Sequence, residues 1–223
     1  MDVVIIGAGG HGKVVADILR DALDAGTTEA RPIGYLDADA SLRGRSVAGL
    51  QVLGPVNLLS KLWHQNVRHA IVAIGDNRTR RRYADVLREH AFEPHSVIHP
   101  SAVVSRSASL GRGIMVSAQA VICTEAHIGD FCIINTAAVV DHECRIGHGV
   151  HIAPGAHLAG RVKVEDDAFV GIGANVIQCL TIGAGSIVGA GAVVTRDVPP
   201  GTTVAGVPAR PMALPPNAVK PAE

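Results

Sequence analysis

Residues 134–163 read INTAAV VDHECR IGHGVH IAPGAH LAGRVK, five blocks of six residues that each begin with Ile, Val or Leu. The frame continues in both directions without an insertion, because every sixth residue from Ile98 to Val194 is aliphatic, seventeen positions in all. So long a fixed period indicates a repeated structural unit. The residue four places after the aliphatic one is usually small, as at Ala138 and Cys144. One large and one small inward residue per block suits a narrow prism with short strands as its faces.

This pattern resembles the hexapeptide-repeat, left-handed parallel β-helix, in which three blocks make one coil. Equivalent residues of successive coils then stack at the strand spacing of about 4.8 Å, and the blocks give nearly six coils over roughly 27 Å. Such a solenoid buries its apolar ladder only when neighbouring coils stack. We assign residues 98–198 to the β-helix. Residues 199–223 are rich in proline, and we expect them to form a tail that packs loosely or frays.

Residues 1–97 follow a different pattern, in which apolar runs alternate with helical stretches. The expected strands and helices are, in order, a strand at 2–6, a helix at 13–25, strands at 33–36 and 70–74, and a helix from about 78 to 90. This order predicts a small parallel α/β domain of the Rossmann-like type.

A glycine-rich loop follows the first predicted strand. Gly7, Gly9 and Gly12 fit the spacing G-x-G-x-x-G between a strand and a helix, where small residues let a phosphate approach the backbone N–H groups at the helix start. Asp37 ends the second strand, and an acid at that point can hold a ribose hydroxyl. Because the domain is about half the size of a complete dinucleotide fold, we expect one mononucleotide. A tight turn without a ligand is the alternative.

Chemistry on the β-helix must come from residues that face outward at its corners, since the ladder is sealed. His142 is third in its block and lies beside Glu143. A carboxylate next to a histidine suits a general base, because the acid fixes the tautomer and stabilises the imidazolium. A solvated surface ring is the plainer alternative, because the chain has eleven histidines.

A metal site is a second alternative for the histidines of the β-helix. Five of them are close in sequence, but a coil of three blocks places none directly above another: His127, His142, His148, His151 and His157. We therefore expect no metal.

Charge, the N-terminal residues and cysteine spacing limit the partners, the location and the cysteine chemistry that we expect. Twenty basic and twenty acidic residues balance, so we expect neither nucleic acid nor a membrane as a partner. The first residues lack the basic start of a signal peptide and no apolar stretch is long enough to span a bilayer, so we expect a cytoplasmic protein. The four cysteines lack paired C-x-x-C spacing, which favours packed, reduced thiols.

Four sequence elements together resemble the bacterial PglD/NeuD-type acyltransferases: GAGGHGKVV (7–15), IGDNRTR (74–80), NTAAVVDHECRIGHGVHIAPGAHLAG (135–160) and AGVPARPM (205–212). The resemblance implies that acetyl-CoA donates an acetyl group to the 4-amino group of a nucleotide-linked 4-amino-4,6-dideoxy sugar, by direct transfer. It also implies a homotrimer, with acetyl-CoA between adjacent prisms and the sugar nucleotide on the N-terminal domain. Such an enzyme serves polysaccharide biosynthesis or a related glycan pathway.

The resemblance gives roles to single residues. It makes His142 the catalytic base and Glu143 the acid that raises its basicity. The coenzyme contacts that it implies are His151, Gly160, Ile172 and Ala190. The acceptor contacts that it implies are Gly9, Gly10, His11, Asp37, Gly75, Asn77 and Asn135.

Two other functions stay open at this stage. A sibling branch of the family acetylates a hydroxyl of sialic acid with the same base, and a trimeric scaffold or nucleotide-sensing module would need no chemistry at all. The acidic pair seen in some relatives is replaced by Asp37-Ala38-Asp39, which leaves the nucleotide base, uracil or guanine, undecided.

Overall fold

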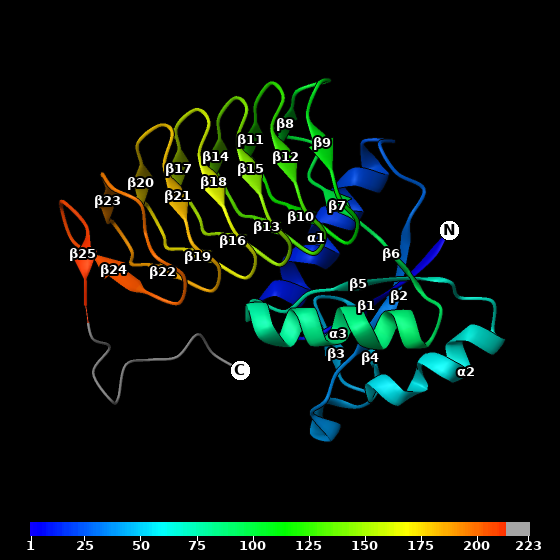
Figure 1. The fold of residues 1–223 in the computed structure, drawn as a ribbon. Coiled ribbons are helices and arrows are strands. Elements are labelled where there is room, and N and C mark those ends of the chain that lie inside the picture. Colours follow the sequence, from blue (N-terminus) through cyan, green and yellow to red (C-terminus); the bar gives the residue numbers. More distant parts are fainter. Residues whose placement is uncertain (213–223) are drawn as a thin grey trace. The chain divides into compact units, whose positions relative to one another are not determined.

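The computed structural model describes residues 1–212 and divides the chain into two compact units, Met1–Pro100 and a second unit that begins at Ser101 (Figure 1). The expected order, an α/β domain followed by a left-handed β-helix of hexapeptide repeats, is confirmed.

The first unit is built on a six-stranded sheet with the order β3-β4-β2-β1-β5-β6. Its strands are β1 (Asp2–Ile6), β2 (Arg31–Leu36), β3 (Ser46–Val47), β4 (Leu50–Gly54), β5 (His69–Val72) and β6 (Glu93–Pro94), and β7 (Val97–Ile98) follows. Its helices are α1 (Gly10–Asp24), α2 (Leu59–His64) and α3 (Asn77–Glu89), with 3-10 turns at Ala40–Leu42 and Val56–Leu58. All pairings in this sheet are parallel except β3 with β4.

The core of the first unit lies around β1. Residues 3–6 of this strand are buried, which fits a central strand covered on both faces. Helix α1 buries one face through Val15, Ile18 and Leu19, spaced as an amphipathic helix requires. This helix begins earlier than expected, at Gly10, so the second half of the glycine loop is already helical.

The second unit consists of two-residue strands that stack in register. They are β8 (Val103–Val104), β9 (Ser109–Leu110), β10 (Met115–Val116), β11 (Val121–Ile122), β12 (His127–Ile128), β13 (Ile133–Ile134), β14 (Val139–Val140), β15 (Arg145–Ile146), β16 (His151–Ile152), β17 (His157–Leu158), β18 (Lys163–Val164), β19 (Phe169–Val170), β20 (Asn175–Val176), β21 (Thr181–Ile182), β22 (Ile187–Val188) and β23 (Val193–Val194). Each pairs in parallel with the equivalent strand of the neighbouring coil, as Val139 does with Val121 and with His157. The predicted coil of three blocks is confirmed.

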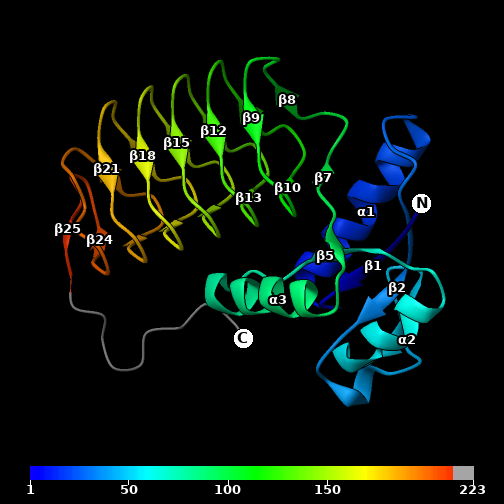
Figure 2. The ribbon, with the colours of Figure 1, turned by 45° about the vertical axis from the view of Figure 1, so that its right-hand side comes forward.

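The strands form three flat faces, which we call sheets 1, 2 and 3. Sheet 1 includes the run β22-β19-β16-β13-β10, sheet 2 runs β23-β20-β17-β14-β11-β8, and sheet 3 runs β21-β18-β15-β12-β9. Figure 2 shows the members of sheet 3 standing in a row along the prism. Two of the corners between these faces are named after one of their residues. The Ile172 corner joins sheets 1 and 2 through residues 117–120, 135–138, 153–156, 171–174 and 189–192. The His142 corner joins sheets 2 and 3 through residues 123–126, 141–144, 159–162 and 177–180.

The aliphatic ladder is buried from Val116 to Val194, as predicted. The first positions differ: Ile98 is 37% exposed, and Val104 and Leu110 are only partly buried. A coil at the end of a solenoid has a neighbouring coil on one side only, so its inward residues are covered less well.

Left-handed backbone recurs at the corners. At the His142 corner Glu125, Glu143, Arg161 and Cys179 occupy the same position in four successive coils, with φ angles of 57°, 58°, 60° and 62°. For a non-glycine residue this conformation costs about 1–2 kcal/mol. The corner geometry is therefore imposed by the coil and not by the residue that occupies it.

The expectation of a loose tail after residue 198 is wrong for its first part. Strand β24 (Thr203–Ala205) pairs in parallel with β22, and β25 (Arg210–Pro211) pairs antiparallel with β24. The last coil offers an unpaired strand edge, and the segment covers it despite its prolines. Residues 213–223 lie outside the described part of the chain. Within residues 1–212, no helix is both long and apolar enough to cross a membrane.

Candidate active site

The predicted base and its acid meet at the His142 corner, between β14 and β15. His142 Nδ1 lies 3.0 Å from Glu143 Oε2, and the two side chains are 46% and 48% exposed. The backbone N–H of His142 donates to Asp141 Oδ1 at 2.7 Å, and that of Glu143 donates to the Thr124 carbonyl at 2.9 Å. When Nδ1–H donates to the carboxylate, Nε2 carries the lone pair. The pair is therefore arranged as a base with an orienting acid.

The next coil adds two residues to this corner. Gly160 holds the position of His142 one coil later, and Arg161 holds that of Glu143. Arg161 Nε is 3.7 Å from the same Glu143 oxygen that faces His142. The carboxylate thus stands between a histidine and a guanidinium.

His151 and Asn135 also lie together, on neighbouring coils. The Asn135 amide nitrogen is 3.1 Å from His151 Nε2, while its oxygen accepts from the Thr136 N–H at 2.8 Å. The His151 ring packs edge-on against Phe169, with ring centroids 5.1 Å apart, and the residue is 5% exposed. These contacts fix the ring and make Nε2 the acceptor of the pair.

Ile172 and Ala190 occupy one column of the Ile172 corner, and the Gly191 N–H donates to the Ile172 carbonyl at 2.8 Å. Ile172 is 60% exposed, in contrast to the buried aliphatic ladder. This corner and the His142 corner lie at opposite edges of sheet 2. Each face spans one block, so at about 3.3 Å per residue successive corners are separated by up to about 20 Å. A single chain therefore does not bring Ile172 and Ala190 to His142.

The glycine loop of the first unit is open at its tip. A methyl group placed on Gly9 or Gly10 would meet no atom within 4 Å. Gly9 is the N-cap of α1 and provides no side-chain cap, so the first N–H groups of the helix are left for another acceptor. Gly12 has a different purpose, because a methyl there would lie 2.2 Å from the Gly7 oxygen. It allows the helix to pack closely on the strand.

Asp37 shapes this loop from the end of β2. One carboxylate oxygen accepts from the Ala8 N–H at 2.7 Å, and the other accepts from the Asp39 N–H at 2.9 Å. A carboxylate oxygen has a second lone pair, so Asp37 can still accept from a hydroxyl.

His11, Gly75 and Asn77 meet at the ends of β1 and β5, around a residue that the sequence reasoning missed. Arg80 is 1% exposed and donates to the carbonyls of Ile74 at 2.9 Å and Gly75 at 3.1 Å, and to Asn77 Oδ1 at 2.7 Å. A methyl on Gly75 would lie 2.9 Å from the His11 ring. Burial and, secondarily, the Arg80 charge lower the pKa of His11, which favours a neutral ring at pH 7.

The sequence did carry a signal for Arg80. It is in phase with Tyr83, Ala84 and Leu87, the buried face of α3. A charged residue at a core-phase position of a helix needs partners.

Known proteins resemble the whole chain. A family model described as the PglD N-terminal domain matches residues 2–87. Over 222 residues the chain is 36% identical to GDP-perosamine N-acetyltransferase of Escherichia coli O157:H7, with 96% of this chain and 98% of that protein covered. The chain belongs to the PglD-type sugar acyltransferases.

Solved structures of PglD-type proteins also resemble this chain over nearly its whole length. PerB from Caulobacter crescentus, in complex with CoA and GDP-perosamine, is 45% identical with a TM-score of 0.89, covering 96% of this chain and 98% of that one. The acetyltransferase domain of PglB from Neisseria gonorrhoeae FA1090 is 40% identical with a TM-score of 0.86, covering 95% and 99%; it has also been solved with acetyl coenzyme A. The expectation of an acetyltransferase of this family is confirmed.

Cys144 follows His142 by two residues but does not face the surface at this corner. Cys144 faces inward, is fully buried and lies 3.2 Å from the Ala159 carbonyl oxygen. Burial raises the pKa of its thiol to about 11. Because the reactive species is the thiolate, we expect Cys144 to be a poor nucleophile.

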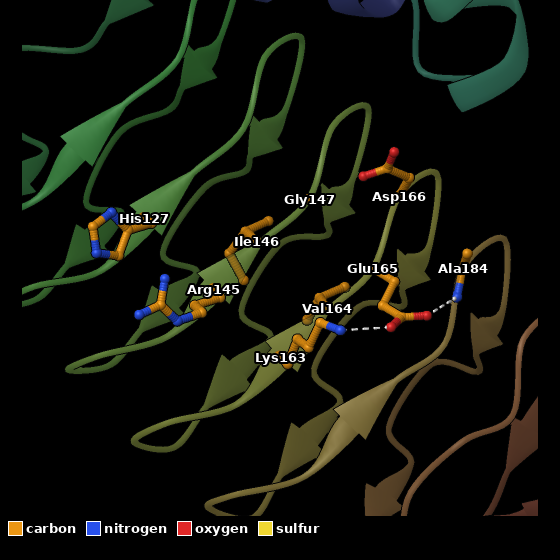
Figure 3. A pocket seen from close by; sticks show the side chains of 9 residues that line it. All are labelled: His127, Arg145, Ile146, Gly147, Lys163, Val164, Glu165, Asp166 and Ala184. Atoms are coloured by element: carbon orange, nitrogen blue, oxygen red, sulfur yellow. Dashed lines mark hydrogen bonds and ion pairs between the residues drawn. The ribbon is translucent and has the colours of Figure 1, made fainter.

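A hollow of 440 Å³ lies on sheet 3 and extends to the corner that follows its strands, at Gly147, Glu165 and Ala184 (Figure 3). None of the predicted site residues lines it. Two of the charged side chains that line this hollow form an ion pair, with Lys163 Nζ 2.7 Å from Glu165 Oε1. Glu165 also accepts a hydrogen bond from the Ala184 N–H. A smaller hollow of 280 Å³ includes Glu143 and Arg161. Among residues 1–212, no group of three or more His, Cys, Asp or Glu side chains could hold a metal ion.

Proposed function

We propose that this PglD-type protein transfers the acetyl group of acetyl-CoA to the 4-amino group of a GDP-linked 4-amino-4,6-dideoxy sugar. The observation that carries the proposal is the contact of 3.0 Å between His142 Nδ1 and Glu143 Oε2, which leaves Nε2 as a base at an exposed corner. The relatives from E. coli and Caulobacter, similar over nearly the whole chain, are named for GDP-perosamine. They favour guanine over uracil as the nucleotide base.

His142 has one task in this reaction. An amino sugar is largely protonated at neutral pH, and an ammonium group has no lone pair. The ammonium first loses one proton to solvent, and the neutral amine then attacks the thioester carbonyl while His142 Nε2 accepts a second proton from its nitrogen; the C–N bond forms, the C–S bond breaks, and the imidazolium returns its proton to the departing thiolate. Glu143 stabilises the imidazolium while it exists. With Cys144 sealed in the core, no acetyl-enzyme is needed.

Acetyl-CoA supplies the activated acyl group, and the Ile172 corner fits its binding. The exposed Ile172 and the small Ala190 give an apolar surface on two successive coils, and His151 and Gly160 complete the expected contacts. Open amides at Gly9 and Gly10, a neutral His11 and the Asp37 carboxylate suit a nucleotide diphosphate and its ribose on the first unit.

A homotrimer explains why the two corners are apart. Because sheet 2 separates the base from Ile172 in one chain, a second copy is needed to bring an Ile172 corner to a His142 corner. The outward residues of sheet 2 favour such a contact, since Val103 is 61% exposed and Val121 and Val139 are partly exposed in the same column. We infer that each complete site takes residues from two subunits.

The test is a thiol-release assay with acetyl-CoA and a panel of GDP- and UDP-linked 4-amino-4,6-dideoxy sugars. We expect the GDP-linked amine to give the highest kcat/KM. His142→Ala should lower kcat by at least about 100-fold with little change in the KM for acetyl-CoA. Absence of thiol release with every amino sugar, or full activity of the variant, would overturn the proposal.

A further inference from the structure

The His142 ring lies directly against the backbone of Gly160, one coil further along the prism. A methyl group built on Gly160 would lie 2.4 Å from His142 Nε2, 2.5 Å from Cε1 and 3.0 Å from Cδ2. Real side chains essentially never approach a neighbouring heavy atom this closely. The ring position seen here is therefore possible only because residue 160 has no side chain.

We propose that Gly160 is a positioning residue for the catalytic base. Because residue 160 has no side chain, the His142 ring packs directly against its Cα, and this packing site, which we call the seat, sets the direction of Nε2. The inference rests on the proposed function, in which Nε2 takes the proton. It differs from the coenzyme contact expected of Gly160, because it concerns the missing side chain and not the backbone groups.

The backbone of Gly160 cannot move away to make room. The Cys179 N–H donates to the Gly160 carbonyl at 3.1 Å, and the Arg161 N–H donates to the His142 carbonyl at 2.9 Å. These bonds are part of the ladder that stacks the coils, and both flanking strands, β17 and β18, are paired on either side. The coil spacing at this corner is thus fixed on both sides of the ring.

The ring, in contrast, can move. Its side chain is 46% exposed, and the contacts shown for it beyond Gly160 are those with Glu143. A methyl at position 160 would push the ring toward solvent and break the 3.0 Å contact with the carboxylate. The damage should then appear in catalysis and not in folding, since misplacing a reacting group by about 1 Å can cost on the order of 100-fold in rate.

The experiment compares Gly160→Ala with Gly185→Ala. Gly185 is a corner glycine with a φ of 62°, and a methyl there would meet nothing within 4 Å. Phe131 and Asp167 hold the same left-handed conformation in the same column, so this corner accepts a side chain. We expect Gly160→Ala to lower kcat by at least about 10-fold, with the KM for acetyl-CoA and the melting temperature close to those of the parent protein. Gly185→Ala should keep the parent kcat.

A double variant separates the seat from a coenzyme contact. If Gly160 acts through the ring, adding Gly160→Ala to His142→Ala should cause no further loss of the residual activity. If it acts on the coenzyme, the KM for acetyl-CoA should rise in both backgrounds, which would overturn the inference. Unchanged kcat in Gly160→Ala would overturn it as well.

A structural readout keeps this inference distinct from the proposed reaction. In a crystal structure of Gly160→Ala, the His142 ring should be displaced and its Nδ1 should no longer contact Glu143. This outcome is expected even if the parent protein releases no thiol with any amino sugar, a result that would count against the proposed function alone. A ring in its parent position beside Ala at 160 would refute the seat.

Discussion

Replacing Glu143 by Gln tests how much of the activity depends on a negative charge beside the base. The two side chains have the same shape, so Gln can keep an oxygen near His142 Nδ1, which lies 3.0 Å from Glu143 Oε2. What the variant loses is the charge that stabilises the imidazolium.

The size of the loss follows from the environment of the contact. A hydrogen bond to a charged group contributes about 1.5–3 kcal/mol and a neutral one about 0.5–1.5 kcal/mol. Because both side chains are about half exposed, water weakens the difference, and we take the lower part of the range, about 1 to 1.4 kcal/mol. Expressed as a rate, this is a decrease in kcat of about 5- to 10-fold. It is smaller than the loss expected for His142→Ala, which removes the base itself.

The assay is thiol release at saturating acetyl-CoA, with Glu125→Gln as the matched control. Glu125 precedes Glu143 by one coil in the same column, with a φ of 57°, and it makes no contact with His142 among those found in residues 1–212. A kcat of Glu143→Gln within twofold of the parent would refute the assigned role. So would an equal loss in Glu125→Gln.

Three further outcomes are expected. Iodoacetamide at pH 8 should alkylate the exposed Cys179 well before Cys144, whose raised pKa leaves about a thousandth of its thiol ionised, as peptide mass mapping would show. Gly12→Ala should lower the free energy of unfolding in urea by about 1–3 kcal/mol, because the new methyl meets the Gly7 oxygen. The lowered pKa of His11 means that the unfolded chain binds its proton more readily, so stability should fall as the pH drops below about 6.5, and His11→Asn should flatten that slope in urea titrations at pH 5–7.5.

The β-helix could be predicted almost completely because its sequence period and its structural period are the same. Each block contributes one inward aliphatic residue, and the frame from Val116 to Val194 is buried as the pattern requires. The segment after residue 198 could not be predicted this way, since β24 lies outside the frame and gains its place by covering a strand edge. Its prolines suggested a tail, but backbone pairing with the last coil outweighed them.

The first unit shows where local patterns are insufficient. The hairpin of β3 and β4 turns through Ala48 and Gly49, both with positive φ, and an alanine in that position gives no clear turn signal. Helix α2 has only six residues, too few for a helical period to show.

The site was predictable as a set of residue types but not as an arrangement. The pairing of His142 with Glu143 follows from adjacency in a corner, whereas the seat at Gly160 depends on the stacking of successive coils together with the direction of the ring. The separation of Ile172 from His142 by sheet 2 requires the three faces to be assigned. Arg80 shows the same limit, because its partners are carbonyl groups that no residue pattern reveals.

Because Glu143 has a left-handed backbone, thermal stability and catalytic activity favour different side chains at this position. Glycine adopts a φ of 58° without penalty and asparagine does so more easily than glutamate, so either replacement should raise the melting temperature. Either would also remove the carboxylate that faces the base. A search for thermostable variants judged only by unfolding would therefore select less active proteins at position 143, whereas a screen on product formation would retain the strained acid.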